Sequence, residues 1–358
     1  MNSFGRKFRV SIFGESHGDA IGVVLDGVQP GIALTQEDFA ADILRRKSGP
    51  KGTTPRTETD EPQFLSGLYN GFTTGAPLTI IFHNRNTRST DYKLFNDVPR
   101  PGHADYTASI KWLDFNDPRG GGHFSGRLTL PLVAAGVVAK KMVGYPVTAR
   151  LVEVGGVTRA EALASRREEA LPDGGIEEKG PQADADLWRD VLEAAIADLD
   201  SVGGIVECRA DGIPAGLGEP FFDSVESLIS HAVFAIPGVR GIEFGDGFQA
   251  ARMRGSEHND PFDTAVGANL GLHVNVHPSK NGAGGINGGI TNGNPLVFRV
   301  AFKPTSSIGR KQETFNFATG QMTTLQIPGR HDACFALRTP VVVEAVTAIV
   351  LADLVRLL

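Results

Sequence analysis

Two helical segments of the sequence are apolar on nearly every face. The first spans residues 131–143 and consists of Leu, Val, Ala and Gly until it reaches Lys140 and Lys141. The second begins at Thr339-Pro340 and keeps the same character through Val341, Val346, Ile349, Leu351 and Leu354. A helix that is apolar all round has to be covered on more than one side. We therefore predict an α+β fold with a helical layer between two outer layers of sheet.

Alternating apolar and polar side chains predict the strands of those outer layers. The pattern covers residues 8–13 and again residues 21–25, and similar segments recur at 63–68 and 78–83. Thr35 and Asp38 resemble a capping box that opens a helix, and the sequence Arg45-Arg46-Lys47 ends it. Asp105 is predicted to cap a further short helix through Trp112.

The two halves of the chain share a weak internal sequence similarity. Residues 22–27, followed by a Pro-Gly turn and a helix, resemble residues 204–212, which are followed by Pro214, Gly216 and a helix. We expect one domain over residues 1–358 with pseudo-symmetric halves, each supplying one sheet. Between them, residues 157–200 are acidic, and we expect this segment to be solvated and to carry no chemistry.

The charge of the chain restricts its partners. A net charge of −6 argues against a nucleic acid or membrane-surface partner, because either would repel the protein at long range. Many Arg and Lys residues nevertheless lie in or beside glycine-rich segments, which suggests a positive pocket for a small polyanion. The two cysteines, Cys208 and Cys334, look like buried apolar side chains in a reducing compartment. The N-terminal apolar run is too short for a signal peptide, so we expect a cytoplasmic protein.

The segment from residue 100 to 127 has the composition of a binding site. His103 stands between a Pro-Gly pair and an aspartate, and a triple glycine at 120–122 is flanked by Arg119 and Arg127. Glycines allow backbone N–H groups to converge on an anion, arginines add charge, and a histidine can exchange a proton near neutral pH. The alternative is a surface loop with a solvated histidine.

Other segments add chemical groups at turns. His17 lies in a Gly-Glu-Ser-His-Gly turn between two predicted strands, and Lys303 precedes three hydroxyl residues. The glycine-rich residues 281–289 come before a strand, which excludes a dinucleotide fingerprint because that motif must open a helix. We read this loop as pressed against a ligand or another backbone. Since the His and Asp residues are scattered singly, we expect no metal site.

In combination these segments resemble the chorismate synthase family from Phe4 to the C-terminus. The motifs that carry the resemblance are Phe13-Gly-Glu-Ser-His-Gly18, Arg45-Arg46, Arg100-Pro-Gly-His-Ala-Asp105, Arg119-Gly-Gly-Gly122, Gly245-Asp-Gly-Phe248, Gly284-Gly-Ile-Asn-Gly-Gly289, Lys303-Pro-Thr-Ser-Ser307 and Gly329-Arg-His-Asp332. The resemblance implies helices sandwiched between two antiparallel sheets, and a homotetramer. It also implies an anti 1,4-elimination of phosphate from 5-enolpyruvylshikimate 3-phosphate to give chorismate, which requires reduced FMN without net redox change.

The same resemblance implies a role for each matching residue. His17 matches the histidine that protonates the departing phosphate, His103 the one that protonates or hydrogen-bonds the reduced flavin, and Asp332 an aspartate that helps the flavin act as a base. Flavin-binding positions fall on Ser125, Gly288, Lys303, Pro304, Thr305, Ser306, Ser307 and Arg330, with His123 and Phe124 at one corner. Positions for the substrate, or for the phosphate of NADPH as an external reductant, fall on Arg45, Arg46, Lys51, Arg127 and Arg338.

The sequence departs from the family pattern at two places. Lys51 stands where many relatives have arginine, which removes a bidentate fork. His123-Phe124 replaces a more familiar Arg-Ser. The sequence does not decide whether the protein reduces its own flavin.

Two other functions fit parts of the pattern. A flavin-independent phosphate lyase or phosphatase could use His17 and His103 as acid and base, although hydrolases usually show a metal cluster or an evident nucleophile. Phosphate release without flavin would support it. A binding module without chemistry would predict that His17→Ala and Asp332→Asn leave ligand affinity and activity unchanged.

Overall fold

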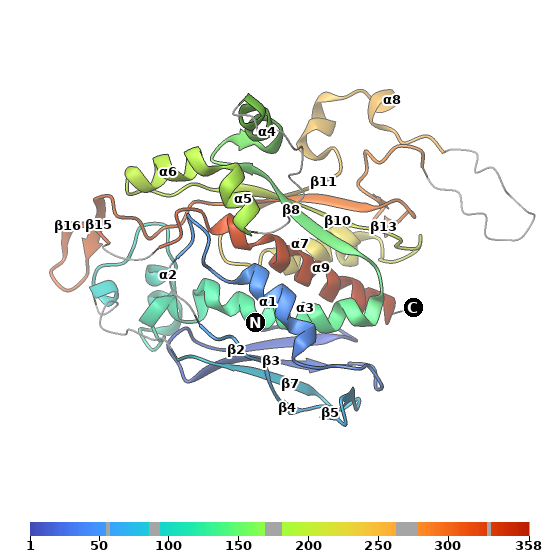
Figure 1. Ribbon diagram of the computed structural model, residues 1–358, viewed down its shortest axis with the longest axis horizontal. Helices are drawn as coiled ribbons and strands as arrows, with labels where there is room; N and C mark the ends of the chain where they lie inside the picture. The colour runs from blue at the N-terminus through green and yellow to red at the C-terminus, as the bar shows by residue number, and fades with distance from the viewer. Residues whose placement is uncertain (55–57, 86–93, 169–180, 263–277, 328–330, 358) are drawn as a thin grey trace, which may run out of the picture.

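The computed structural model describes residues 1–54, 58–85, 94–168, 181–262, 278–327 and 331–357, and it has three layers (Figure 1). One outer layer is an antiparallel sheet with the strand order β1 (Ser3–Phe4), β2 (Arg9–Gly14), β3 (Ala20–Asp26), β7 (Leu78–His83) and β4 (Gln63–Ser66). The other is an antiparallel sheet with the order β11 (Val239–Phe244), β14 (Leu296–Phe302), β10 (Gly204–Ala210), β8 (Val147–Val154) and β9 (Val157–Thr158).

The inner layer consists of helices that lie between the two sheets (Figure 1). Its members are α1 (Glu37–Arg46), α3 (Thr129–Val143), α7 (Val225–Val233) and α9 (Pro340–Val355). Residues 340–354 of α9 are all buried, including Glu344 and Asp353. The prediction of a covered helical layer is confirmed, because a helix without a polar face is stable only where other elements remove all its sides from water.

The strands follow their sequence pattern. In β3 the side chains of Ile21, Val23 and Leu25 are buried, and Ala20, Val24 and Asp26 are more exposed. β3 and β10 are the central strands of their respective sheets, and each is followed along the chain by a helix of the inner layer, α1 and α7. The two similar segments, residues 22–27 and 204–212, therefore supply the central strands of the two sheets, which supports the expectation of related halves.

The contact between α3 and α9 depends on a glycine. A Cβ atom added at Gly136 would lie 2.3 Å from the Cβ and 2.5 Å from the Cα of Ala345. The two backbones therefore approach more closely than any side chain at position 136 allows. This contact holds α3 and α9 together, and both helices contribute side chains to the lining of the cavity described below.

We expect Gly136→Val to lower the free energy of unfolding by about 1–3 kcal/mol, since the added carbons overpack a buried interface. The measurement is urea unfolding at equilibrium, where the midpoint falls and the slope is unchanged. Gly255→Val is the matched control, because a Cβ at Gly255 meets no atom within 4 Å. Equal stability of the two variants would contradict the proposed role of Gly136.

The acidic segment corrects one expectation. Residues 159–168 form α4 (Arg159–Glu168), and the segment continues with α5 (Pro181–Leu187) and α6 (Arg189–Ala197). Trp188 is 1% exposed, Leu187 and Leu192 are also buried, and Trp188 Nε1 donates to the Val157 carbonyl at 3.0 Å. A solvated segment is therefore the wrong description of residues 181–192. Their apolar side chains cover the end of the second sheet, while the acidic groups face outward or pair with arginine, as Asp184 does with Arg159.

Shorter elements complete the described chain. They are α2 (Asp105–Trp112), α8 (Gly255–His258), and the strand pairs β5 (Leu68–Tyr69) with β6 (Phe72–Thr73), β12 (Ile286–Asn287) with β13 (Ile290–Thr291), and β15 (Gln312–Asn316) with β16 (Gln321–Leu325). Among all the residues that the structure describes, no helix is both long and apolar enough to cross a membrane. Cys208 and Cys334 are buried as predicted, and burial raises the pKa of each thiol to about 12.

Candidate active site

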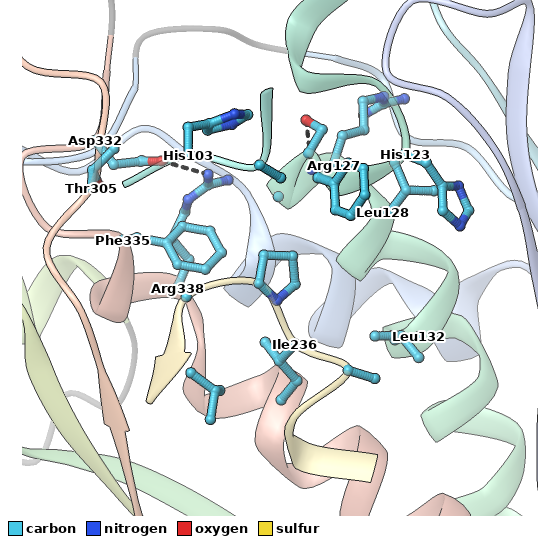
Figure 2. Close-up of a pocket in the computed structure, with 18 of the residues that line it drawn as sticks. His103, His123, Arg127, Leu128, Leu132, Ile236, Thr305, Asp332, Phe335 and Arg338 are labelled. Carbon is cyan, nitrogen blue, oxygen red and sulfur yellow. Dashed lines mark hydrogen bonds and ion pairs between the residues drawn. The ribbon is translucent and has the colours of Figure 1, made fainter. Parts of the chain in front are cut away.

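A cavity of about 1230 Å³ opens between the ends of the two sheets and the helical layer. Figure 2 shows His103, Arg127 and His123 along one wall, and Leu132 and Ile236 on the opposite side. Among the described residues its lining includes seven basic side chains, Arg46, Lys47, Arg100, Arg127, Arg240, Lys303 and Arg338, and three acidic ones, Glu58, Asp60 and Asp332. The cavity is thus positive in a chain of net charge −6.

Three buried guanidinium groups form the most cationic wall of the cavity. Arg46 ends α1, Arg127 lies in a 3-10 turn (Gly126–Leu128), and Arg338 precedes α9. Asp60 lies between the first two, with its Oδ2 3.1 Å from Arg46 Nη2 and its Oδ1 2.8 Å from Arg127 Nη1. Arg338 Nη2 donates to Asp332 Oδ2 at 2.8 Å, the ion pair drawn in Figure 2. Three cations therefore share two carboxylates.

The protonation of this wall follows from its burial. Burial, together with the neighbouring charges of Arg338 and Arg127, lowers the pKa of Arg46 to about 10, although Asp60 opposes the shift. Arg46 therefore still carries its charge at neutral pH. The Nε atoms of Arg46 and Arg338 are buried without a hydrogen-bond partner among the described residues. A buried unpaired donor is costly, so these atoms are suited to an anionic ligand.

His17 lies in the loop between β2 and β3, on which the triple glycine packs. The side chain is 7% exposed, and the Ser16 N–H donates to the Gly122 carbonyl at 3.1 Å. A Cβ at Gly120, whose φ is +62°, would lie 2.1 Å from His17 Nδ1. A Cβ at Gly121 would lie 3.4 Å from His103 Nε2. The glycines therefore make room for two imidazole rings at the cavity.

This arrangement corrects the anion cradle expected of the triple glycine. The Gly121 N–H donates to the Pro118 carbonyl at 3.1 Å, so it is already engaged within the turn. Arg119 pairs with Asp117 at 2.8 Å, its side chain is 45% exposed, and it does not line the cavity. Of the two arginines that flank the glycines, only Arg127 brings its charge to the site.

The carboxylate of Asp105, which the sequence analysis predicted to cap a helix, contacts His103 instead. Asp105 is the first residue of α2, yet no side chain caps this helix. Its Oδ1 lies 2.6 Å from His103 Nδ1, and Arg100 donates to both of its oxygens at 2.7 Å. The prediction that Asp105 is a helix cap is wrong, because charge-assisted bonds to a buried guanidinium are stronger than a capping bond to a backbone N–H.

Residues 303–307 form the part of the wall next to His103. Lys303 Nζ donates to the Gly102 carbonyl at 3.1 Å and contacts Ser306 Oγ, which itself donates to the same carbonyl at 2.7 Å. Ser307 Oγ accepts from Arg100 Nη1 at 3.1 Å. Thr305 Oγ1 is buried without a partner among the described residues. Together with Pro304 these residues line the cavity, and burial lowers the pKa of Lys303.

The segment after the triple glycine also faces the cavity. His123 Nδ1 donates to the Gly14 carbonyl at 2.7 Å, which fixes the proton on that nitrogen. Phe124 packs against Trp112 with ring centroids 5.5 Å apart. Ser125 Oγ accepts from the Arg127 N–H at 3.3 Å. All three residues line the cavity, so His123 and Phe124, where the sequence departs from the family pattern, lie on its wall.

Three predicted site residues in the described part of the chain are not brought to the cavity. Arg45 turns away and binds Glu344 of α9 at 2.7 and 2.8 Å, and Lys51 pairs with Glu193 on α6 at the surface. Gly288 lies in the β12–β13 turn and does not contribute to the lining. These three residues do not line the cavity of a single chain, so their assignment to the ligands stays a prediction. Arg330 lies outside the described residues.

The structure adds residues that the sequence interpretation did not assign. Asp60 neutralises two arginines, and the Thr54 N–H donates to Asp332 Oδ1 at 2.9 Å. His331 Nε2 is buried and has no partner among the described residues. Buried arginines need counter-charges, which is a signal that carboxylates exist nearby. The sequence could not identify Asp60 as this partner, because it lies in a loop without a motif, far from Arg127 in the chain.

Comparisons with known proteins agree over the length of the chain. The family model described as chorismate synthase matches residues 8–356. A chorismate synthase of Chitinophaga pinensis is 57% identical in an alignment that covers 100% of this chain and 97% of the relative. One of Dehalococcoides mccartyi is 44% identical over 99% of this chain and 96% of its own. A crystal structure of a chorismate synthase matches with a TM-score of 0.70 and 25% identity, covering 98% of this chain and 92% of the other.

Proposed function

The chain belongs to the chorismate synthase family, and on that basis we propose that its positive cavity binds reduced FMN and 5-enolpyruvylshikimate 3-phosphate together. The reaction is the anti 1,4-elimination of phosphate from this substrate, which yields chorismate. The observation that carries the site proposal is that Arg46, Arg127 and Arg338 line one cavity together with His17. Both proposed ligands carry a phosphate, and guanidinium groups bind phosphate through paired N–H donors.

The residues present fit a bound flavin. The cavity of about 1230 Å³ exceeds the roughly 300–1,000 Å³ of a single small-molecule site, which leaves room for two ligands in contact. It offers buried unpaired polar atoms on Thr305, Arg46 and Arg338, and an apolar wall for a ring system. That wall includes Phe4, Val10, Ile12, Leu132, Ile236, Val346 and Ile349. Reduced FMN, when bound, supplies the electron-rich ring that the elimination requires.

We assign the residues that hold each ligand from the family resemblance, and their presence in the lining of one cavity supports this assignment. Lys303, Pro304, Thr305, Ser306, Ser307, Ser125, His123 and Phe124 are proposed to bind the flavin, and Arg46, Arg127 and Arg338 the substrate. His17, which lines the same cavity as the arginine cluster, is proposed to donate a proton to the departing phosphate. The arginines stabilise the charge that develops on that group.

Asp332 is suited to act as the anionic group of the site. Its Oδ2 accepts from Arg338 Nη2 and its Oδ1 from the Thr54 N–H, which fix its position on the lining of the cavity. It lies on the same cavity wall as His103 (Figure 2). We propose that Asp332 assists removal of the substrate proton, and that His103 contacts the flavin.

Other parts of the proposal extend beyond the site. We propose that NADPH serves as an external reductant, that the protein assembles as a homotetramer, and that it works in the cytoplasm as one domain over residues 1–358. The shared helical layer, which both sheets cover, supports the single domain. A homotetramer would also offer a place for Gly288, which lies outside the cavity of its own chain.

The decisive experiment is anaerobic incubation of the purified protein with 5-enolpyruvylshikimate 3-phosphate, with and without chemically reduced FMN. Chorismate absorbance and free phosphate are followed together. We expect equal amounts of both products, and only when reduced FMN is present. Turnover without flavin, or phosphate without chorismate, would contradict the proposal and point to a flavin-independent phosphate lyase or phosphatase.

A further inference from the structure

Four side chains form a continuous polar chain that leads to His103. Ser307 Oγ accepts from Arg100 Nη1 at 3.1 Å, Arg100 binds Asp105 through Nε and Nη2 at 2.7 Å each, and Asp105 Oδ1 lies 2.6 Å from His103 Nδ1. The Arg100 N–H also donates to Asp105 Oδ2 at 3.0 Å. The side chains of Arg100 and Asp105 are only 5% and 6% exposed. Asp105 could neutralise Arg100 without touching His103, so the short, buried contact between its carboxylate and the imidazole calls for a second explanation.

The contact fixes the proton of the imidazole. An ionised carboxylate only accepts hydrogen bonds, so the atom at 2.6 Å from it, His103 Nδ1, has to carry the proton. Arg100 Nη2 lies 3.0 Å from the same nitrogen and carries two N–H groups, one of which it donates to Asp105 Oδ1. The contact of Nδ1 with the carboxylate is the shorter of the two, so it decides the position of the proton. The other nitrogen, Nε2, faces the Gly121 side of the cavity.

The surroundings keep the ring neutral. The charged groups that act on His103 are Asp105, Arg100 and Lys303. Burial lowers the pKa of His103, the two cations lower it further, and Asp105 only partly compensates. Arg100 and His103 together hold the pKa of the Asp105 carboxyl far below its usual range, despite its burial. Asp105 is therefore ionised while His103 is neutral at pH 7, and Nε2 offers a lone pair.

We propose that Asp105 is a positioning residue that acts through His103, holding the ring in the Nδ1–H tautomer so that Nε2 accepts a hydrogen bond from an N–H group of the bound ligand. Arg100 keeps Asp105 in place and links it to Ser307. The proposal rests on the proposed function in one respect, the placement of the flavin next to His103. It narrows the role of His103, because a neutral ring in this tautomer accepts at Nε2 and does not donate there.

The tautomer can be measured without any ligand. In protein labelled with ¹⁵N at histidine, the His103 resonances are identified by their loss in the His103→Ala variant. We expect the chemical shift of a protonated nitrogen at Nδ1 and of an unprotonated nitrogen at Nε2 at pH 7. In Asp105→Asn we expect a mixture of tautomers. A proton on Nε2 in the unsubstituted protein would overturn the proposal, whether or not any variant folds.

A double-mutant cycle separates positioning from structure. We expect Asp105→Asn to lower kcat/KM by about 10- to 100-fold, as for other groups that orient a functional histidine. In the His103→Ala background the same change is expected to cost less than about twofold. The matched control is Asp114→Asn, since Asp114 follows the same helix, is bonded to Ser109 and lies at the surface away from the cavity lining.

The outcomes distinguish this inference from the proposed function. An equal loss from Asp105→Asn in both backgrounds would show a purely structural role and overturn the inference. The pH profile of kcat/KM adds a second readout, since removing the Asp105 charge is expected to move the limb that reports His103 to lower pH. If His103→Ala leaves kcat/KM unchanged, the flavin contact of His103 is refuted, and the ¹⁵N spectrum still decides the tautomer.

Discussion

Replacement of His17 by alanine is expected to lower kcat by about 10²–10⁴-fold, the range for loss of a positioned proton donor. The departing phosphate would then leave without a proton from the protein, and only the arginine cluster would stabilise its charge. Because His17 is proposed to act on the leaving group in the transition state, kcat is expected to fall more than KM changes. The measurement is steady-state chorismate formation under anaerobic conditions with reduced FMN.

Two companion variants make this test specific. Gly120→Ala keeps the imidazole but places a Cβ 2.1 Å from His17 Nδ1, so the ring has to move and kcat is expected to fall as well. His83→Ala removes an exposed histidine whose ring is paired with Gln63, and we expect no change. Normal turnover by His17→Ala would contradict the leaving-group role. A loss of folded protein in either variant would show as a lowered unfolding midpoint.

The layers of the fold could be predicted because their signals are local. A strand such as β3 shows its alternation within seven residues, and α9 shows that no face is polar. The acidic segment was misjudged for the same reason. Its composition is polar on average, and the burial of Trp188 depends on a docking partner, the second sheet, that lies elsewhere in the sequence.

Site residues could be predicted only where they lie in a motif that matches the family. His17 and His103 were expected to converge from the family resemblance, and the structure brings both to one cavity. Arg45 and Arg46 show the limit of sequence patterns. Neighbouring positions on a helix differ by about 100° in direction, so one guanidinium enters the cavity while the other binds Glu344. Only the packing of α1 against α3 and α9 decides which of them does so.

Asp60 illustrates a partner that no local pattern reveals, and it supplies the second large effect. Its side chain is 1% exposed and bridges Arg46 and Arg127. We expect Asp60→Asn to lower the free energy of unfolding by about 3–5 kcal/mol, because it leaves two buried guanidinium groups facing each other with one fewer counter-charge. Urea unfolding at pH 7 measures this loss. Asp211→Asn is the control, since its pair with Arg209 is exposed and worth at most about 1 kcal/mol.

The effect of Asp60→Asn is expected to depend on pH. Burial alone would raise the pKa of Asp60, but Arg46 and Arg127 outweigh it and lower the pKa in the folded protein. A lowered folded-state pKa contributes stability above the unfolded pKa of about 4, and this contribution is lost as the pH falls through the folded value. The difference between the unsubstituted protein and the variant is therefore expected to be constant above about pH 5 and to shrink below pH 4.

Added inorganic phosphate tests whether these arginines are also the anion site. The anion can take the place of the missing carboxylate, so it is expected to restore part of the lost stability in Asp60→Asn, and to stabilise this variant more than the Asp211→Asn control. Recovery would show that the guanidinium groups are held apart for a ligand, with Asp60 as the group that keeps them together in its absence. Equal stability of Asp60→Asn and Asp211→Asn, without phosphate, would contradict the bridging role.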